Sequence, residues 1–415
     1  MTVPDVVQLA QRLIRVPSPN PPGDEVAMAS VVRDVLSELG LPEAELIALD
    51  PQRPNLLLTV DLGPGGRHLV LSGHLDTKPV GDAPWTVHPW AADVDGDRLY
   101  GLGSADMKAA IAAMMLAIHR VATSGAGHGR LSLLLTADEE DGAAYGAHHV
   151  ATTVGLPADG VVIGEPGGLH ADYDHLHLVS RGIARMRVVA TGRQGHSSLS
   201  GEPGTRNAGV DAARAVVAVA DALALRTPPN TERLRGWEAT TNTGMAFRGG
   251  VGYGVLPGVM AVDTEVRLLP GMRREDVEAA VSAVLEDVRA RTGADLRLEF
   301  DASPNDWLPA TSVAAAHPLA VAAAAAHRAV FGSAPPASVF PGTTDATWFA
   351  SAAGIPTLPA VGPGLLRRCH GADEWVSVTA VRRSVDLYAE LTTSFCAGGD
   401  AEPVTADAGS GQEGS

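Results

Sequence analysis

The sequence predicts an α/β protein with a central mixed sheet and a smaller inserted α+β domain. Apolar strand-like runs alternate with helix-like runs in the first part of the chain, which is typical of α/β sheets. Three of these strands end directly in acids or a histidine, at the strand ends where open α/β sheets bind ligands. Further along, the order becomes strand, helix, strand, strand, helix, strand, the pattern of a small two-layer domain.

We therefore expect two domains, one of them discontinuous. Residues 1–177 and 301–397 would form the first domain, and residues 178–300 would form an insert whose βαββαβ order is ferredoxin-like. Residues 398–415 are rich in Gly, Ala and acids, so we expect a disordered tail.

The elements of the first domain follow from hydrophobic spacing and from breakers. Its first helix is ended by the proline-rich run from Pro17, and its second helix ends at Gly40. A long loop follows the second strand, and loops of that length are usually functional or ordered by a ligand. In order, we expect helices at 3–16 and 24–39, strands at 55–60 and 68–72, the loop at 78–102, a helix at 104–121, and strands at 131–136 and 161–164.

The same reasoning gives the insert and the end of the chain. The insert should contain strands at 184–191, 242–248, 259–268 and 294–300 and helices at 205–225 and 273–291. After it we expect a helix at 317–330, a strand near residue 355 and a last helix at 378–395.

Composition excludes several classes of protein. The 415 residues carry a formal net charge of −17 and contain no cluster of basic residues, so nucleic acid is not an expected partner. No apolar run reaches membrane-spanning length, and the start lacks the basic and apolar segments of a signal peptide. We therefore expect a soluble, cytoplasmic protein. The two cysteines make no disulfide framework, which agrees with a reducing compartment.

His74 and Asp76 follow the strand at 68–72 and are two residues apart. Because side chains alternate along an extended chain, they point the same way, while Leu75 faces the opposite side. Alone, the pair is compatible with a polar strand end at the surface. Acids elsewhere in the chain favour a site instead.

Acids recur at comparable places. Asp106 lies in the entry turn of the helix at 104–121, where helix capping is the alternative role. The acids from Asp138 to Asp141 follow the strand at 131–136, where a solvated turn is the alternative, and Glu165 follows the next strand. Polar residues that are merely exposed to solvent do not explain this recurrence, so we expect the acids to meet at one site.

Histidines and carboxylates together indicate a pair of divalent metal ions rather than a proton-transfer dyad. Two neighbouring ions need a bridging carboxylate, and Asp106 suits that role. His74 and Glu165 would complete one site, and Glu140 and His370 would complete the other. Mixed imidazole and carboxylate ligands favour zinc, with cobalt or manganese as alternatives.

Two neighbours of these ligands have expected roles of their own. Asp76 would hold the ring of His74 by a hydrogen bond from behind. Glu139 would be the general base that takes a proton from a metal-activated water and returns it to the leaving nitrogen. This chemistry is amide hydrolysis.

Motifs spread over residues 5–396 resemble those of a dizinc metallohydrolase family that contains aminoacylases, acetylornithine deacetylases, succinyl-diaminopimelate desuccinylases and glutamate carboxypeptidases. The motifs are Ser72-Gly-His-Leu-Asp-Thr77, Tyr100-Gly-Leu-Gly-Ser-Ala-Asp-Met-Lys108, Ala137-Asp-Glu-Glu140, Gly164-Glu-Pro166, Gly192-Arg-Gln-Gly-His-Ser-Ser198 and the late His370. The resemblance implies a zinc-peptidase-like catalytic domain, an inserted domain that acts as lid and homodimer interface, and the same ligand and base assignments.

The resemblance also implies residues that bind substrate. His196 would reach the partner subunit's active site and help bind the substrate carbonyl, although an exposed histidine is the plainer interpretation of the residue alone. Arg267 would bind a substrate carboxylate, where an ordinary surface charge is the alternative. Thr343 and Thr344 would line the substrate pocket, which is compatible with helix capping by Thr344 or Asp345.

Three positions depart from the family pattern. Gly254 stands where asparagine is common, and Tyr253 is a possible substitute for the lost polar contact. Leu102 stands where arginine is frequent, and Cys369 stands where a small residue is usual. No ligand position is lost, so the departures concern specificity.

These patterns lead us to expect a deacylase that cleaves the amide bond of an N-acyl amino acid, a small substrate derived from an amino acid. A metallo-carboxypeptidase or dipeptidase would use the same site and is the alternative. An inactive binding homologue is disfavoured because every ligand position and the base are present.

Overall fold

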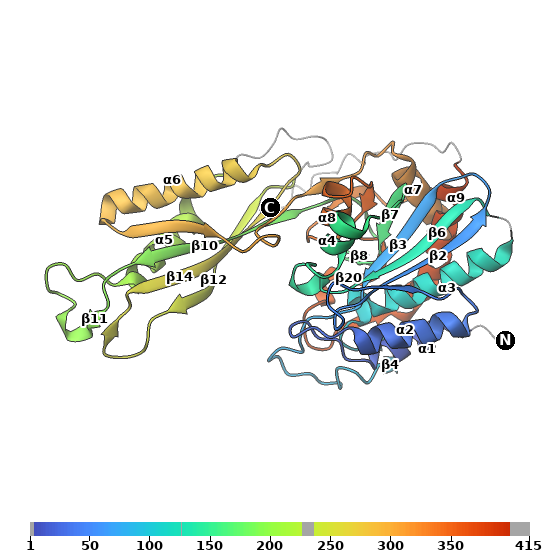
Figure 1. The fold of residues 1–415 in the computed structure, drawn as a ribbon, viewed down its shortest axis with the longest axis horizontal. Coiled ribbons are helices and arrows are strands. Elements are labelled where there is room, and N and C mark those ends of the chain that lie inside the picture. Colours follow the sequence, from blue (N-terminus) through green and yellow to red (C-terminus); the bar gives the residue numbers. More distant parts are fainter. Residues whose placement is uncertain (1–3, 126, 226–235, 399–415) are drawn as a thin grey trace, which may run out of the picture. The chain divides into compact units, whose positions relative to one another are not determined.

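The structure is a computed structural model, and it describes residues 4–125, 127–225 and 236–398 (Figure 1). The chain divides into two compact units: the first unit, Met1–Ser180 with Thr311–Ser415, and the second unit, Arg181–Ala310. These boundaries lie later than the 178 and 300 expected from sequence. Strand β9 (Leu176–Ser180) pairs within the first unit, and strand β16 (Trp307–Leu308) pairs within the second.

The first unit is built on a six-stranded mixed sheet with the order β1-β2-β6-β3-β7-β19. The strands β6, β3, β7 and β19 run parallel to one another, whereas β2 is antiparallel to β6, and β1 is antiparallel to β2 at the edge of the sheet. The mixed α/β sheet predicted from the sequence is therefore confirmed. Its strands are β1 (Glu45–Ile47), β2 (Asn55–Gly63), β3 (His68–His74), β6 (Gly129–Thr136), β7 (Gly160–Ile163) and β19 (Thr357–Leu358).

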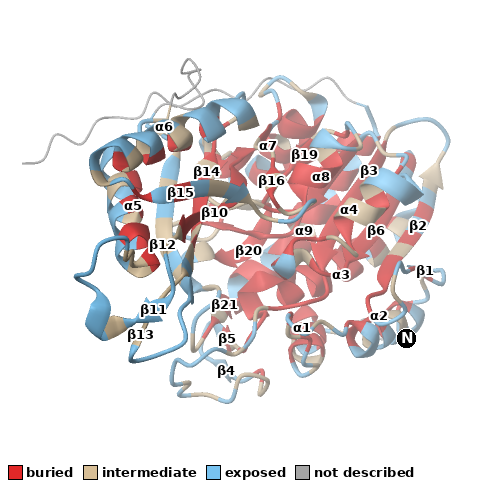
Figure 2. Ribbon diagram, turned by 60° about the vertical axis from the view of Figure 1, so that its left-hand side comes forward, coloured by how far each residue is buried: buried red, intermediate tan, exposed pale blue. Residues whose placement is uncertain are grey.

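Burial explains why these runs form strands. Every residue of β3 is buried, and so is nearly all of β6, as expected for parallel strands covered on both faces (Figure 2). Helices α3 (Ala109–Ser124) and α9 (Val378–Cys396) pack on each other and on the strands of this sheet. The sheet and its helices thus fix the positions at which the strands end.

The first unit contains further helices and small sheets. No helix in the described ranges is long and apolar enough to cross a membrane. The helices are α1 (Val6–Ile14), α2 (Val26–Glu38), α4 (Ala147–His149), α7 (Pro318–Phe331) and α8 (Ala346–Ser351). The small sheets are β17 (Thr311–Ser312) with β9 and β18 (Ala337–Phe340), β20 (Gly362–Leu365) with β8 (Pro166–Gly168), and β21 (Trp375–Ser377) with β5 (Arg98–Tyr100) and β4 (Val94–Asp95).

The helix expected at 104–121 begins later as a regular α-helix. Residues Ser104–Lys108 form an irregular turn, in which Asp106 and Met107 have non-helical backbone angles, and α3 starts at Ala109. This turn carries the carboxylate of Asp106 into the interior, so the residue does not serve as an ordinary cap.

Among its described residues, 181–225 and 236–310, the second unit contains an antiparallel sheet and the two helices α5 and α6. Its strand order is β12-β14-β10-β15, which with the chain order βαββαβ gives a ferredoxin-like topology. Its own apolar core contains Val188, Val262 and Leu285. The elements are β10 (Gly182–Thr191), β11 (Gly195–His196), α5 (Ala208–Ala222), β12 (Thr240–Gly249), β13 (Val255–Leu256), β14 (Val259–Leu268), α6 (Arg274–Thr292) and β15 (Asp295–Phe300). The tail expected from residue 398 lies, beyond that residue, outside the described ranges.

Candidate metal centre and active site

Three neighbouring strands deliver the site residues to one edge of the central sheet. Strand β3 lies between β6 and β7 and runs parallel to both, with His74 beside Thr136 and Ser72 beside Ile163. Because parallel strands have their carboxyl ends on the same side of the sheet, His74 meets the acids that follow β6 and the Glu165 that follows β7.

Asp106 lies between two histidines. Its Oδ1 is 2.9 Å from Nε2 of His74, and its Oδ2 is 3.2 Å from Nε2 of His370. The side chain of Asp106 is 8% exposed. A carboxylate with one oxygen beside each of two imidazoles has the arrangement that a ligand bridging two ions requires.

Glu165 and Glu140 flank this carboxylate on its two sides. Oε1 of Glu165 is 3.4 Å from Nε2 of His74, and Oε2 of Glu140 is 3.3 Å from Nε2 of His370. The backbone of His370 has a φ of 61°, in the left-handed region that is uncommon for residues other than glycine. Such local strain is typical of functional sites.

Two overlapping groups of side chains could hold metal ions. In each group the potential ligand atoms lie within 4.8 Å of one another. The groups, found among the described residues, are His74 with Asp106 and Glu140, and His74 with Glu139 and Glu165. Glu139, which the sequence analysis assigns as a base, therefore lies among the potential ligand atoms of the second group.

The electrostatics of these residues fits divalent cations. Burial first, and the neighbouring carboxylate of Asp106 second, raise the pKa of Glu165 to about 8. Burial and the Glu165 carboxylate raise the pKa of Glu139 well above its usual range. So many buried carboxylates are not stable as anions without positive charge. The oxygen and imidazole donors suit zinc, cobalt or manganese, so the predicted metal centre has its donor set in place.

Asp76 contacts His74 mainly through its backbone. Nδ1 of His74 is 3.0 Å from the carbonyl oxygen of Asp76 and 3.5 Å from its carboxylate. The carboxylate accepts hydrogen bonds from the backbone N–H groups of Glu139 and Glu140 and from Nδ2 of Asn20. Asp76 thus holds the loop that contains Glu139 and Glu140 as well as the imidazole of His74.

A buried network behind Asp76 is absent from the sequence-based site. Asn20 also donates to Asp138, which has a left-handed φ of 65°. Arg53 donates two hydrogen bonds to Glu25, at 2.7 and 2.9 Å, and a third to Asp138 at 2.9 Å. Asn20 belongs to the Pro-rich run that the sequence analysis treated only as a helix stop, and Glu25 lies at the start of the helix expected at 24–39. The polar Asn20 within the Pro-rich run is the signal that was overlooked.

Glu374 is a further residue that the sequence analysis missed. Its side chain is buried, and its Oε1 accepts hydrogen bonds from the backbone N–H groups of Ala105 and Asp106, at 2.8 and 3.2 Å. It fixes the irregular turn that presents the Asp106 carboxylate. Its position four residues after His370 is the only sequence signal.

The expected substrate residues of the second unit have their own local setting. His196 is exposed, and its Nδ1 is 2.8 Å from Oγ of Ser198. Pairing of β11 with β13 brings it beside the loop that contains the fully exposed Tyr253 and Gly254. Arg267 pairs with Glu265 at 3.0 Å. His196 and Tyr253 thus belong to one surface loop pair, and Arg267 lies on strand β14.

The expected pocket loop at Thr343 and Thr344 precedes α8. Oγ1 of Thr344 accepts a hydrogen bond from the N–H of Ala346 at 3.2 Å, so Thr344 contributes to capping. Asp345 does not cap the helix, because its Oδ2 accepts a hydrogen bond from Oγ1 of Thr136. Burial raises the pKa of Asp345 to about 7.

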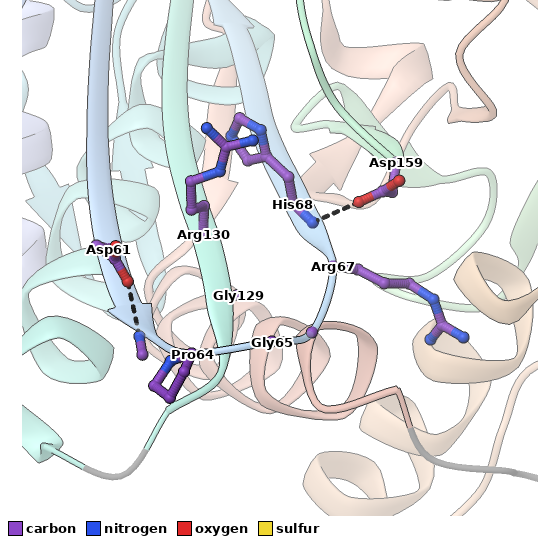
Figure 3. Close-up of a pocket in the computed structure, with 10 residues that line it drawn as sticks. Asp61, Pro64, Gly65, Arg67, His68, Gly129, Arg130 and Asp159 are labelled. Carbon is purple, nitrogen blue, oxygen red and sulfur yellow. Dashed lines mark hydrogen bonds between the residues drawn. The ribbon is translucent and has the colours of Figure 1, made fainter.

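The opposite end of the sheet carries a different hollow, of about 270 Å³ (Figure 3). The Gly-rich turn between β2 and β3 lines it. Its two acids are engaged by backbone, since Asp61 accepts from the N–H of Gly63 and Asp159 from the N–H of His68. The side chains of Arg67 and Arg130 point in different directions in Figure 3. No group of converging donors forms there, and we assign it no role.

Comparisons with known proteins identify relatives of this chain. Residues 70–394 match the model of the peptidase family M20/M25/M40. A succinyl-diaminopimelate desuccinylase of Rhodospirillum centenum is 30% identical over 97% of this chain and 100% of that protein. An acetylornithine deacetylase of Proteus mirabilis is 28% identical over 95% of this chain and 97% of that protein.

A solved structure shares the fold. The crystal structure of an M20 family metallo-carboxypeptidase from Sulfolobus solfataricus superposes with a TM-score of 0.79 at 18% identity, over 95% of this chain and 100% of that one. These matches confirm the family that the sequence motifs resemble. They also confirm that the protein is a hydrolase that acts on amide or peptide bonds. The chain belongs to the peptidase family M20/M25/M40.

Proposed function

We propose that the protein is a two-metal deacylase that removes an acyl group from the nitrogen of an amino acid. The observation that carries the proposal is the Asp106 carboxylate, with one oxygen beside His74 and the other beside His370. Relatives matched along nearly their whole length, named a desuccinylase and a deacetylase, favour deacylation over peptide cleavage.

The proposed ligands divide into two sets that share one carboxylate. When bound, divalent ions would lower the pKa of a coordinated water from 15.7 toward about 7 and polarise the scissile carbonyl. The residues that would hold them are His74, Asp106 and Glu165 for one ion and Asp106, Glu140 and His370 for the other.

Glu139 is the proposed proton carrier. It would accept a proton from the attacking water and pass that proton to the leaving nitrogen. Burial and the Glu165 carboxylate raise the pKa of its carboxyl group, which makes the carboxylate a stronger base for the first of these steps. Asp76, which accepts the N–H of Glu139, would keep the base in place.

We further propose a homodimer formed through the second unit. Strand β12 is an edge strand, and its outer residues Met245 and Phe247 are 59% and 55% exposed. Val217, on α5, is 58% exposed. Apolar side chains on an unpaired edge support an interface between copies. In that dimer, His196 of one copy would complete the active site of the other, and Arg267 would bind the substrate carboxylate. Tyr253, Thr343 and Thr344 would line the pocket.

We place the enzyme in the cytoplasm. The free thiols of Cys369 and Cys396 support this placement, because cysteines stay reduced in that compartment.

The test is amine release from N-succinyl, N-acetyl and N-formyl amino acids and from dipeptides, with zinc and again after chelation. Metal-dependent release from an acyl series supports the deacylase. Release from dipeptides alone would assign the chain to the peptidase alternative. No release from any substrate by zinc-loaded protein would contradict both.

A further inference from the structure

Lysine is rare in this chain. Lys78 and Lys108 are the only lysines among 31 basic residues, and every other one is arginine. The two residue types differ physically, since lysine carries a compact charge on a flexible stem and arginine carries a planar fork. Both lysines lie close to the metal centre, each two residues after one of its acids, Asp76 and Asp106. This placement suggests that an ammonium group is needed there.

Lys108 has a structural role. It is fully buried, and its Nζ donates a hydrogen bond to the carbonyl oxygen of Val16 at 2.6 Å. The contact ties the start of α3 to the chain that follows α1. A buried amino group with this fixed partner cannot meet a ligand.

Lys78 lies differently, at the rim of the metal centre. Its side chain is 35% exposed. Its backbone N–H donates to Oε1 of Glu140 at 3.1 Å, and its Nζ lies 3.3 Å from Oε2 of the same residue. Its Nζ also contacts the carbonyl oxygen of Glu140. The ammonium therefore sits between the candidate ligand Glu140 and solvent.

Cations at the centre would change the partner of this ammonium. A divalent ion held by Glu140 would compensate the charge of that carboxylate and would repel a second cation beside it. Asp76 is already engaged by Asn20 and by backbone N–H groups, and Glu139 is the proposed base. The flexible stem of Lys78 allows its ammonium to turn to the solvent side, where the substrate arrives.

We propose that Lys78 binds a carboxylate carried by the acyl group of the substrate. The enzyme then selects acyl groups derived from dicarboxylic acids, such as succinyl. In a succinyl group two methylenes separate the scissile carbonyl from the terminal carboxylate, so the cation that binds it has to lie beside the metal centre. Arg267 is proposed for the carboxylate of the amino acid itself. This inference rests on the proposed deacylation and names its substrate class.

The first test compares three substrates that share one amino acid: its N-succinyl derivative, the methyl ester of that succinyl group, and its N-acetyl derivative. Wild type should prefer the succinyl substrate over its ester by about tenfold or more in kcat/KM, as expected for a hydrogen bond between charged groups. Lys78→Met should lose that preference and keep its activity on the other two. Lys78→Arg should keep part of the preference, and Arg130→Met, which removes an exposed cation elsewhere, should keep all of it.

Two results would overturn the proposal. One is a wild type that hydrolyses ester and acid equally well. The other is a Lys78→Met variant that loses activity on all three substrates by the same factor, which would assign Lys78 to holding Glu140. Zinc content measured on each variant separates loss of metal from loss of recognition.

A binding measurement keeps the inference independent of turnover. Zinc-loaded wild type should bind succinate more tightly than butanoate in calorimetry, and Lys78→Met should bind the two alike. Equal binding of both acids by wild type would refute the role of Lys78. Absence of any deacylation together with selective succinate binding would instead refute the proposed function alone.

Discussion

Glu139 is the residue on which the proposed chemistry depends most directly. It lies next to the proposed ligand Glu140, and its backbone N–H is held by Asp76. We predict that Glu139→Ala lowers kcat by about 10²–10⁴, the usual contribution of a general base, while the fold and the bound metal remain. Steady-state kinetics with metal analysis checks this. Turnover close to that of wild type would remove the base assignment.

Of the residues at the candidate site, the sequence predicts those that follow strands and misses those that reach the site through long-range contacts. His74, Glu140 and Glu165 follow apolar strands, and strand ends are visible in a hydrophobic pattern. Asn20 and Arg53 reach the same site only through the folded chain, where Asn20 contacts a residue 118 positions away and Arg53 one 85 positions away. No periodicity encodes such contacts.

Among structural elements, the loop after β6 depends on the buried Arg53. Removing this arginine leaves Glu25 and Asp138 as unpaired charges in the interior, so we predict that Arg53→Leu lowers the free energy of unfolding by about 3–5 kcal/mol. Urea denaturation measures the change.

Arg187→Leu is the matched control. Arg187 also pairs with two acids, Asp263 and Asp301, but its side chain is 35% exposed against 9% for Arg53. Exposed pairs contribute about 0–1 kcal/mol, so the control should change little. Equal losses in both variants would show that burial is not the cause.

The loop between β8 and β9 makes stability depend on pH. Although burial raises the pKa of Asp174, hydrogen bonds from the backbone N–H groups of Leu169, His170 and Ala171 and from the ring of His175 outweigh that effect and lower it to about 2. Because the folded-state pKa lies below the ordinary 3.8, the stabilisation is present above pH 4 and is lost as the pH falls through 2.

The size of this effect follows from the shift and is about 2 kcal/mol. Asp174→Asn keeps the shape and removes the charge, so the gap in unfolding free energy between wild type and variant should narrow from pH 5 to pH 2. Urea denaturation of chelated protein measures it without interference from metal release. A gap that does not change with pH would contradict the role of the carboxylate.

Two element boundaries differ from those predicted from the sequence. The helix expected from residue 104 begins at Ala109, because the turn before it is shaped by the distant Glu374. The insert begins at Arg181 and not at 178, because the strand before it pairs with β17 and β18. Both differences arise from contacts between segments far apart in the sequence.

For the whole molecule, the proposed dimer makes a prediction about shared sites. Glu139→Ala and His196→Ala are each expected to form inactive homodimers. Mixed under conditions that exchange subunits, they should regain activity, because a mixed dimer contains one active site with both residues intact. Random pairing gives half of the dimers as mixed, so about a quarter of the wild-type activity is expected.

The control for this experiment is Phe247→Glu, which places a charge on the exposed edge strand β12 and should favour monomers in analytical ultracentrifugation. Mass spectrometry first establishes that the subunits exchange. If the exchanged mixture then regains no activity, a site shared between subunits is contradicted.

The central claim is a pair of metal ions held around Asp106, and titration of the chelated enzyme with zinc tests it most directly. Hydrolysis of an N-acyl amino acid and bound zinc are followed together. We predict no activity in the chelated protein, full activity at two zinc ions per chain, and loss of the two-ion stoichiometry in Asp106→Ala. Full activity of the metal-free protein, or saturation without a second ion, would contradict it.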